Sequence, residues 1–377
     1  MSYATAAEWA LGFIAAWVVA YALLRNRWRS LTVYPFFLIY RLGYSRTPFG
    51  LSDMKARFSR IYGAIGVAIA TFMMAYFYYV SLQLFIEKYV ARVPGAAAEG
   101  FVPIIPGVTV GLSEFIFILV AIGVAVLVHE LSHALIARSV GVPVKDAGLL
   151  LFAFIPAAFV EPDEEQVSRA SLRSKAMIYA AGIASNAIIG LLFAYVLTSL
   201  TPLLASGITI VSVNANSPAQ LAGLKAGMRI LAIDGKPVKT VSQGLQILAK
   251  LGAESSLSSV NVSLTVAYRD TISTIVVYKP VNESGLGIYV TQSFRLPWLV
   301  NIVLSMYIVN LGLALVNAAP FAIPFPGLGV ETDGAQLLRD ALAKVGGSAG
   351  KSISMAIELL TLLIIISLIT LTPIRLP

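Results

Sequence analysis

Residues 115–137 of the chain read FIFILVAIGVAVLVHELSHALIA, and this stretch decides the class of fold. Its first fourteen residues carry no charge and run directly into His129, as expected of a helix that crosses a membrane. Ionisable side chains inside such a helix are costly, so those present usually have a function. We therefore expect His129, Glu130 and His133 to form a functional site in or beside the membrane.

The spacing of these residues predicts a zinc site. His129 and His133 are the only two histidines in the sequence and are four residues apart, so on a helix their rings project from one face. With Glu130 they form the HExxH motif of zinc metalloproteases. Such sites commonly have three protein ligands, and zinc lowers the pKa of a water whose proton the glutamate accepts. A purely structural cluster is the alternative, but Glu130 needs a strong partner to offset its desolvation.

The third metal ligand has to be a carboxylate, because the sequence has no cysteine and no third histidine. Asp333, in the sequence ETDG, is the first candidate, and Glu331 and Asp340 are close competitors. Glu161 and Asp163 belong to a charged cluster that is typical of a solvated surface. For Asp333 the alternative interpretation is a turn residue that caps a following helix.

The composition indicates a polytopic membrane protein. Hydrophobic residues make up 58% of the 377 residues and charged residues only 12%, against about 25% charged residues in soluble domains. The net charge of +8 does not indicate nucleic acid binding, because eight lysines and arginines lie between Arg25 and Arg60, directly after the first apolar segment. That placement is typical of a cytoplasmic loop and favours anionic lipid headgroups of the bilayer. The absence of cysteine excludes disulfides and suits a prokaryotic plasma membrane.

We expect a polytopic α-helical membrane protein with about six transmembrane helices and an inserted soluble α+β domain. The spans are predicted at residues 6–24, 61–86, 115–137, 176–200, 298–319 and 353–372. Residues 147–160 are apolar but too short to cross and contain Pro156, which favours a re-entrant or interfacial strand-like segment. No basic region precedes the first span, so we interpret it as a retained helix and not as a signal peptide.

The predicted spans divide the chain into regions. Residues 1–110 hold N-terminal helices and the basic cytoplasmic loop, and residues 111–203 hold the HExxH helix and the re-entrant segment. Between residues 204 and 293, short β-branched runs separated by Gly, Asn and Asp predict the soluble domain. Residues 294–377 form a C-terminal membrane core with the third ligand. With the basic loop inside, the histidines lie in the cytoplasmic half of their span, the soluble domain faces outside, and a loop at 322–352 lies inside.

Three features of the sequence resemble the site-2 protease family of intramembrane zinc metalloproteases. They are HELSH within a span, Asn317-Ala-Ala-Pro320 followed by Asp333-Gly334, and GIASN at residues 182–186, which is similar to the family's Gly-x-x-x-Asn element. The inserted domain resembles a PDZ domain, with SPAQLAGLKAG at residues 217–227 and ILAIDG at residues 230–235.

The resemblance implies roles for individual residues. His129, His133 and Asp333 would ligate one Zn2+, Glu130 would act as general base, and Asn186 and Asn317 would help to position or polarise the scissile carbonyl. A hydrogen bond between helices explains Asn186 equally well. The sequence departs from the family in one respect, because Asp333 follows Pro320 by 13 residues and the family's Asp-Gly follows its proline more closely.

The resemblance also implies the substrate and the partners. Transmembrane-helix proteins would be cut after a first protease has removed their external part, and the helix must be unwound locally before water can attack. Residues 147–160 would offer an edge strand to the unwound segment. The PDZ-like domain would either dock an external C-terminus or act as a size filter. No nucleic acid partner is expected, and no oligomeric state is predicted.

Two other functions are consistent with parts of the sequence. A membrane ion or proton transporter would use the intramembrane His/Glu cluster as a relay, but it predicts inverted repeats and further buried charge that the sequence does not display. A catalytically silent relative would bind membrane substrates without cutting them, but the intact Glu130 argues against it.

Overall fold

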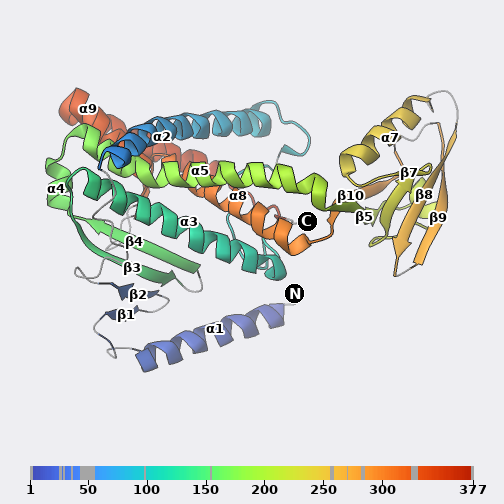
Figure 1. Ribbon diagram of the computed structural model, residues 1–377, viewed down its shortest axis with the longest axis horizontal. Coiled ribbons are helices and arrows are strands. Elements are labelled where there is room, and N and C mark those ends of the chain that lie inside the picture. The colour runs from blue at the N-terminus through green and yellow to red at the C-terminus, as the bar shows by residue number, and fades with distance from the viewer. Residues whose placement is uncertain are drawn as a thin grey trace. The chain divides into compact units, whose positions relative to one another are not determined.

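The computed structural model describes residues 3–24, 28, 30–34, 37–42, 56–96, 99–152, 155–254, 259–269, 271–281, 285–323 and 330–374 (Figure 1). The chain divides into two compact units. Unit 1 comprises Met1–Leu192 and Ser305–Ile374, and unit 2 comprises Phe193–Leu304 with Arg375–Pro377. All the residues predicted for the metal site belong to unit 1.

Five helices in the described residues are long and apolar enough to cross a membrane, so the chain is a polytopic membrane protein. They are α2 (Ala56–Phe85), which continues into the π-helical turn η2 (Ile86–Val90), α3 (Leu112–Ser139), α5 (Leu172–Leu204), α8 (Pro297–Ala318) and α9 (Asp333–Leu368). The first predicted span falls in α1 (Tyr3–Leu24), whose segment Ile14–Leu24 is apolar. Five of the six predicted spans therefore coincide with a helix of sufficient length.

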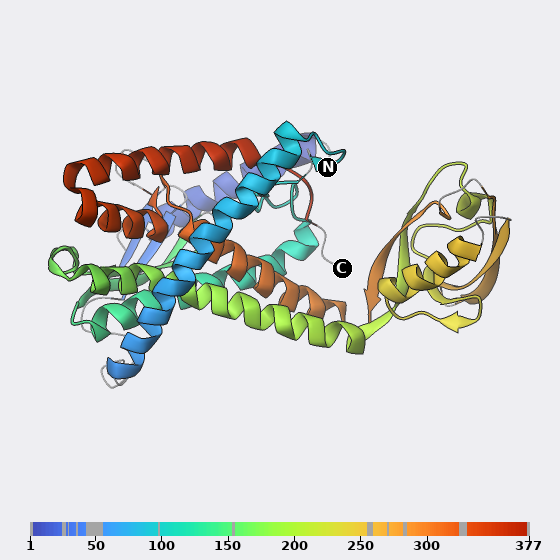
Figure 2. The ribbon, with the colours of Figure 1, turned by 90° about the horizontal axis from the view of Figure 1, so that it is seen from above.

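The last helix differs from the prediction. Because α9 begins at Asp333, most of the predicted loop at 322–352 is helical from residue 333 onward, and the predicted span at 353–372 begins inside this helix. Gly347 has a φ of 56° and divides α9 into two legs, which Figure 2 shows side by side. The charged residues within 339–344 make the first leg too polar for a hydropathy search to detect.

An antiparallel sheet of four strands accompanies the helices of unit 1. It consists of β1 (Leu31–Tyr34), β2 (Phe37–Arg41), β3 (Val144–Phe152) and β4 (Ile155–Pro162), paired in that order. The predicted strand-like segment is thus a pair of strands, with Ala147 opposite Val160. β4 lies at one edge of the sheet among the described strands and packs against α3 (Figure 1). Much of the predicted basic loop, residues 25–27, 29 and 43–55, lies outside the described residues.

Small residues bring α2, α5 and α8 into close contact. Their shared core contains Ala70 and Met73 from α2, Ala180, Ile183 and Ala187 from α5, and Ala314 and Ala318 from α8. Small side chains let membrane helices approach closely, where dispersion contacts hold them together. This packing fixes α5 and α8, which carry Asn186 and Asn317, within one bundle.

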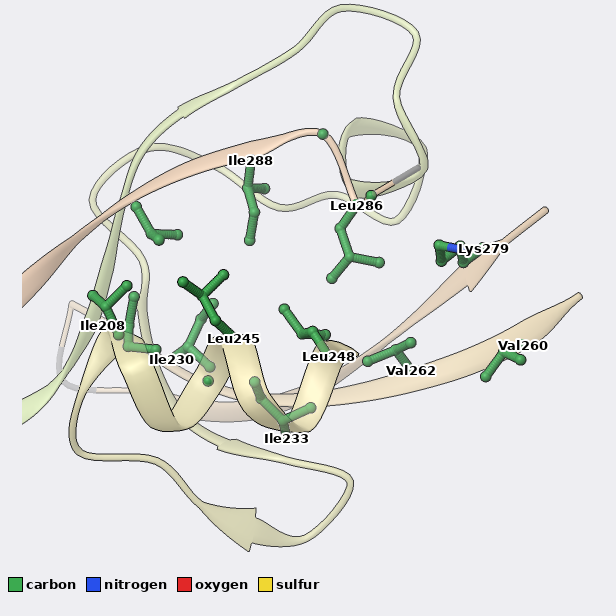
Figure 3. Close-up of a pocket in the computed structure, with 15 residues that line it drawn as sticks. Ile208, Ile230, Ile233, Leu245, Leu248, Val260, Val262, Lys279, Leu286 and Ile288 are labelled. Carbon is green, nitrogen blue, oxygen red and sulfur yellow. The ribbon is translucent and has the colours of Figure 1, made fainter. Parts of the chain in front are cut away.

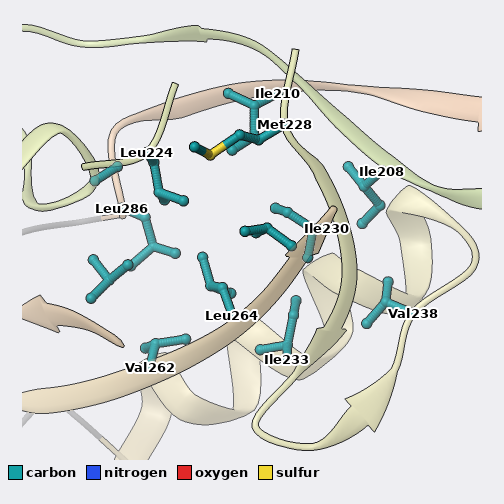
Figure 4. Close-up of a cluster of buried hydrophobic side chains, with 13 residues drawn as sticks. Ile208, Ile210, Leu224, Met228, Ile230, Ile233, Val238, Val262, Leu264 and Leu286 are labelled. Atoms are coloured by element: carbon teal, nitrogen blue, oxygen red, sulfur yellow. The ribbon is translucent and has the colours of Figure 1, made fainter. Parts of the chain in front are cut away.

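Unit 2 is an α+β unit with a core of its own. Its elements are β5 (Ala205–Val213), α6 (Pro218–Leu221), β6 (Arg229–Ile233), β7 (Lys236–Pro237), α7 (Val241–Glu254), β8 (Val260–Tyr268), β9 (Thr271–Lys279) and β10 (Ile288–Phe294). The sheet order is β10-β5-β6-β8-β9, and β7 pairs with β6. Branched residues such as Ile210, Ile233 and Leu264 fill the interior, as Figure 4 shows.

Candidate metal centre

The histidines of α3 and the first residue of α9 meet inside unit 1. His129 and His133 are 6% and 9% exposed, and the centroids of their rings are 4.7 Å apart. Oδ2 of Asp333 lies 3.1 Å from Nε2 of His129 and 3.3 Å from Nε2 of His133. One ligand atom from each of the three residues lies within 4.8 Å of the others. The structure therefore brings the three predicted ligands together.

The long connection before α9 is folded so that Asp333 returns to the end of α8. β11 (Ala322–Ile323) pairs with β12 (Val330–Glu331), which brings the two ends of this connection together. Thr332 caps α9 by accepting from Ala335 N at 3.3 Å. Its hydroxyl also donates to Ala319 O at 2.7 Å, so the cap ties α9 to the end of α8. A Cβ on Gly334 would collide with the Ala318 carbonyl, which explains the glycine after the aspartate.

The donor set fits a divalent cation such as zinc. Nδ1 of His133 lies 2.8 Å from Ile178 O, and because a carbonyl only accepts, the ring N–H must be on Nδ1. A neutral ring then directs the lone pair of Nε2 at the Asp333 carboxylate. Oδ2 of Asp333 is buried and makes no hydrogen bond within the described residues. A cation between Nε2 of His133 and Oδ2 of Asp333 would remove the repulsion between their lone pairs. Two imidazoles with one carboxylate form a known zinc ligand set.

Glu130 is held by the sheet. Its Oε2 accepts from Val160 N, on β4, at 2.9 Å. The side chain lines the same cavity of about 570 Å³ as His129, His133 and Asp333. A carboxylate beside the three donors has the position that a general base for water would need.

The two predicted asparagines occupy different places. Asn317 lines the cavity and donates through Nδ2 to Leu313 O of its own helix at 3.0 Å. Asn186 is completely buried, and its Nδ2 lies 3.0 Å from Nδ1 of His129. Asn317 is thus open to a molecule in the cavity, whereas Asn186 contacts a histidine ring.

The competing carboxylates are engaged elsewhere. Glu331 pairs with Arg339 at 2.5 Å, and Asp340 pairs with Lys175 at 3.3 Å. Asp163 caps α4 (Glu164–Arg169) by accepting from Gln166 N, and this hydrogen bond lowers the pKa of its carboxyl. Glu161 lies 3.7 Å from Arg41, and it lines the cavity but does not belong to the group of three donors.

Several contacts of the site have no counterpart in the sequence analysis. The carbonyl of Ile178 and the amide of Val160 are backbone groups. Because nearly every residue has both groups, the residue type does not indicate such a contact. Lys175 and Tyr179 line the cavity and both contact Asp340. Their spacing of four residues on a helix is a signal that could have indicated a shared face.

Unit 2 has a separate, apolar cavity of about 400 Å³. Figure 3 shows Leu245 and Leu248 of α7 together with Leu286 and Ile288 around it, and Lys279 also lines it. Such a concave apolar surface can take an extended apolar ligand.

Comparisons with known proteins identify a family and two relatives. Residues 117–368 match peptidase family M50. An uncharacterized protein of Methanocaldococcus jannaschii is 28% identical over 331 residues, which cover 85% of each chain. The membrane-bound transcription factor site-2 protease homolog of Arabidopsis thaliana is 31% identical over 159 residues, 41% of this chain and 31% of that protein.

Proposed function

Because the chain belongs to peptidase family M50, the site-2 protease family, we propose that it hydrolyses peptide bonds within transmembrane helices of substrate proteins. The family consists of zinc metallopeptidases. The observation that carries the proposal is the meeting of His129, His133 and Asp333 at 3.1 and 3.3 Å, on helices apolar enough to span a membrane.

His129, His133 and Asp333 would hold the zinc ion, one per chain. When bound, zinc supplies Lewis acidity and lowers the pKa of water toward neutrality. Glu130 accepts the proton of the attacking water and returns it to the amine that leaves. The Val160 amide holds the Glu130 carboxylate in the cavity before the substrate arrives.

The outer edge of β4 is suited to an unwound substrate segment. Ala147 O accepts from Leu42 N, so the backbone groups of Ala147 face β2. The backbone groups of Val160, opposite Ala147, therefore face away from β3, and those of Ala158 do the same because strands alternate. An extended segment of the substrate pairs with this edge by β-augmentation. Asn317, which lines the cavity, would then position the scissile carbonyl.

We assign unit 2 a role in choosing substrates. Residues 204–293 would form a PDZ-like domain outside the membrane, with α1 as a sixth span and the histidines on the cytoplasmic side. The apolar cavity of about 400 Å³ favours docking of an external apolar chain end over a size filter. An upstream protease that trims the external part of the substrate would create such an end.

Zinc content and cleavage of a single-span model substrate, measured for the wild type and E130Q, test the proposal. A protease binds about one zinc per chain in both forms and loses cleavage in E130Q, because only the base is removed. A silent relative binds zinc but does not cleave in the wild type. A transporter binds no zinc, and that result would overturn the proposal.

A further inference from the structure

One face of α5 supports both histidine rings. Ile178, Gly182 and Asn186 are spaced four residues apart and so lie on the same side of the helix. Ile178 O contacts Nδ1 of His133 at 2.8 Å, and Asn186 contacts Nδ1 of His129 at 3.0 Å. The polar contacts of α5 with the two rings are therefore made at Nδ1, the nitrogen that does not face Asp333.

Gly182 lets the ring of His129 lie against α5. A Cβ at this position would lie 2.5 Å from both Nε2 and Cε1 of the ring, closer than atoms can approach. Any larger residue would therefore displace His129. The glycine of the Gly-x-x-x-Asn element has this steric reason to be present.

The Asn186 amide decides which nitrogen of His129 carries the proton. If Nδ2 donates to Nδ1, the proton of the neutral ring is on Nε2, which then has no lone pair for a metal. In that orientation Oδ1 of Asn186, on a completely buried residue, makes no hydrogen bond within the described residues. Rotating the amide by half a turn exchanges its oxygen and nitrogen, so Oδ1 accepts from Nδ1–H and is satisfied.

We infer that Asn186 is a positioning residue that sets the tautomer of His129. Its Oδ1 accepts from Nδ1–H, and Nε2 of His129 is left with its lone pair directed at the metal. Ile178 O likewise accepts from Nδ1–H of His133, so one face of α5 sets the tautomer of both histidines. This inference rests on the proposed metal site and replaces the contact with the scissile carbonyl that the resemblance implies for Asn186. Residues behind a ligating histidine raise its basicity and fix its orientation.

Zinc affinity, measured by competition with a chromogenic chelator, tests the inference without reference to cleavage. N186L removes the acceptor and is expected to weaken zinc binding by about 10- to 100-fold. N186D keeps an acceptor at Oδ1 and is expected to bind zinc at least as tightly as the wild type. N310L is the matched control, because Asn310 is also completely buried but donates to Met306 O of its own helix. Its zinc affinity should equal that of the wild type.

A second readout reports the tautomer directly. The chain has only two histidines, so selective 15N labelling gives one ring N–H signal for each in the zinc-loaded protein. N186L should shift the signal of His129 and leave that of His133 unchanged, which also shows that the fold is intact.

The outcomes separate this inference from the proposed function. Wild-type zinc affinity in N186L, or loss of cleavage in N186D with zinc binding unchanged in both variants, would overturn the positioning role and support a contact with the substrate. Absence of zinc from the wild type would overturn the metal site itself. Weak binding in N186L, normal binding in N186D and a shifted His129 signal support the inference.

Discussion

Asp333 is the residue on which the metal centre depends most. It is the first residue of α9, it faces both histidines, and it has no hydrogen bond at Oδ2 within the described residues. D333A should therefore weaken zinc binding by more than about 100-fold, the upper end of the cost of losing a residue behind a ligand. E331A and D340A are the controls, because Glu331 and Asp340 pair with Arg339 and Lys175. If D333A kept its zinc and one of the controls lost it, the third ligand would be the carboxylate removed in that control.

The side chains of the metal centre could be predicted from the sequence, but the backbone groups around them could not. His129, Glu130 and His133 are readable because their spacing places them on one helix face. Asp333 follows from the shortage of other donors and from the resemblance, although its separation from Pro320 does not reveal that β11 and β12 pair. The carbonyl of Ile178 has no signature in a sequence, since every residue carries one.

Among the elements, β4 links the sheet to catalysis. Val160 N donates to Glu130 and faces away from β3, so proline at 160 removes this donor without removing a bond between strands. V160P should keep its zinc but lose cleavage by about tenfold or more, up to the roughly 100- to 10,000-fold that a general base contributes. Zinc content and kcat measured on the same preparations check this. A158P is the comparison, since its lost donor would affect substrate pairing and therefore KM. Wild-type kcat in V160P would show that Glu130 does not depend on β4.

The two legs of α9 are joined by a partly buried ion pair. Arg339 donates to Glu358 through Nη2 at 2.8 Å and Nε at 3.3 Å, and Ser354 donates to the same carboxylate at 2.8 Å. R339M leaves Glu358 unpaired and should destabilise the fold by up to about 3 kcal/mol, the lower end for a broken buried pair, because the Arg339 side chain is 35% exposed. Thermal unfolding in detergent checks this, with R339M/E358M as the control. The double variant should recover most of the stability. Equal melting temperatures of R339M and the wild type would contradict a stabilising role of this ion pair.

Prediction of elements succeeds where hydropathy is uniform and fails where charge is paired inside the fold. The spans at α2, α3, α5 and α8 follow from long apolar runs. The first leg of α9 does not, because Arg339, Asp340 and their neighbours look like a solvated loop until their partners are known. The four-stranded sheet combines strands from distant parts of the chain, such as β2 and β3, and this pairing has no local signal.

In the molecule as a whole, the chain enters and leaves the sheet of unit 2 through neighbouring strands. Its first and last strands, β5 and β10, pair, and Ala205 lies opposite Phe294. Residues 206–293 can therefore be replaced by a short Gly/Ser linker with little strain on the flanking chain. The shortened chain should bind zinc like the wild type, because all three donors lie in unit 1. It should cleave an already trimmed substrate and no longer discriminate by the substrate's external end; loss of zinc would show that unit 2 is needed for the membrane unit to fold.

The class of the molecule was the most predictable property, since composition and one apolar helix with two histidines already indicate a membrane metalloprotease. The most direct test of the central claim is the position of the bond that is cut. Purified wild type, reconstituted in liposomes with a single-span substrate, should give products whose new termini, mapped by mass spectrometry, lie inside the hydrophobic segment. E130Q should give no such products. Cleavage confined to the flanking soluble sequences, or equal cleavage by E130Q, would contradict the account.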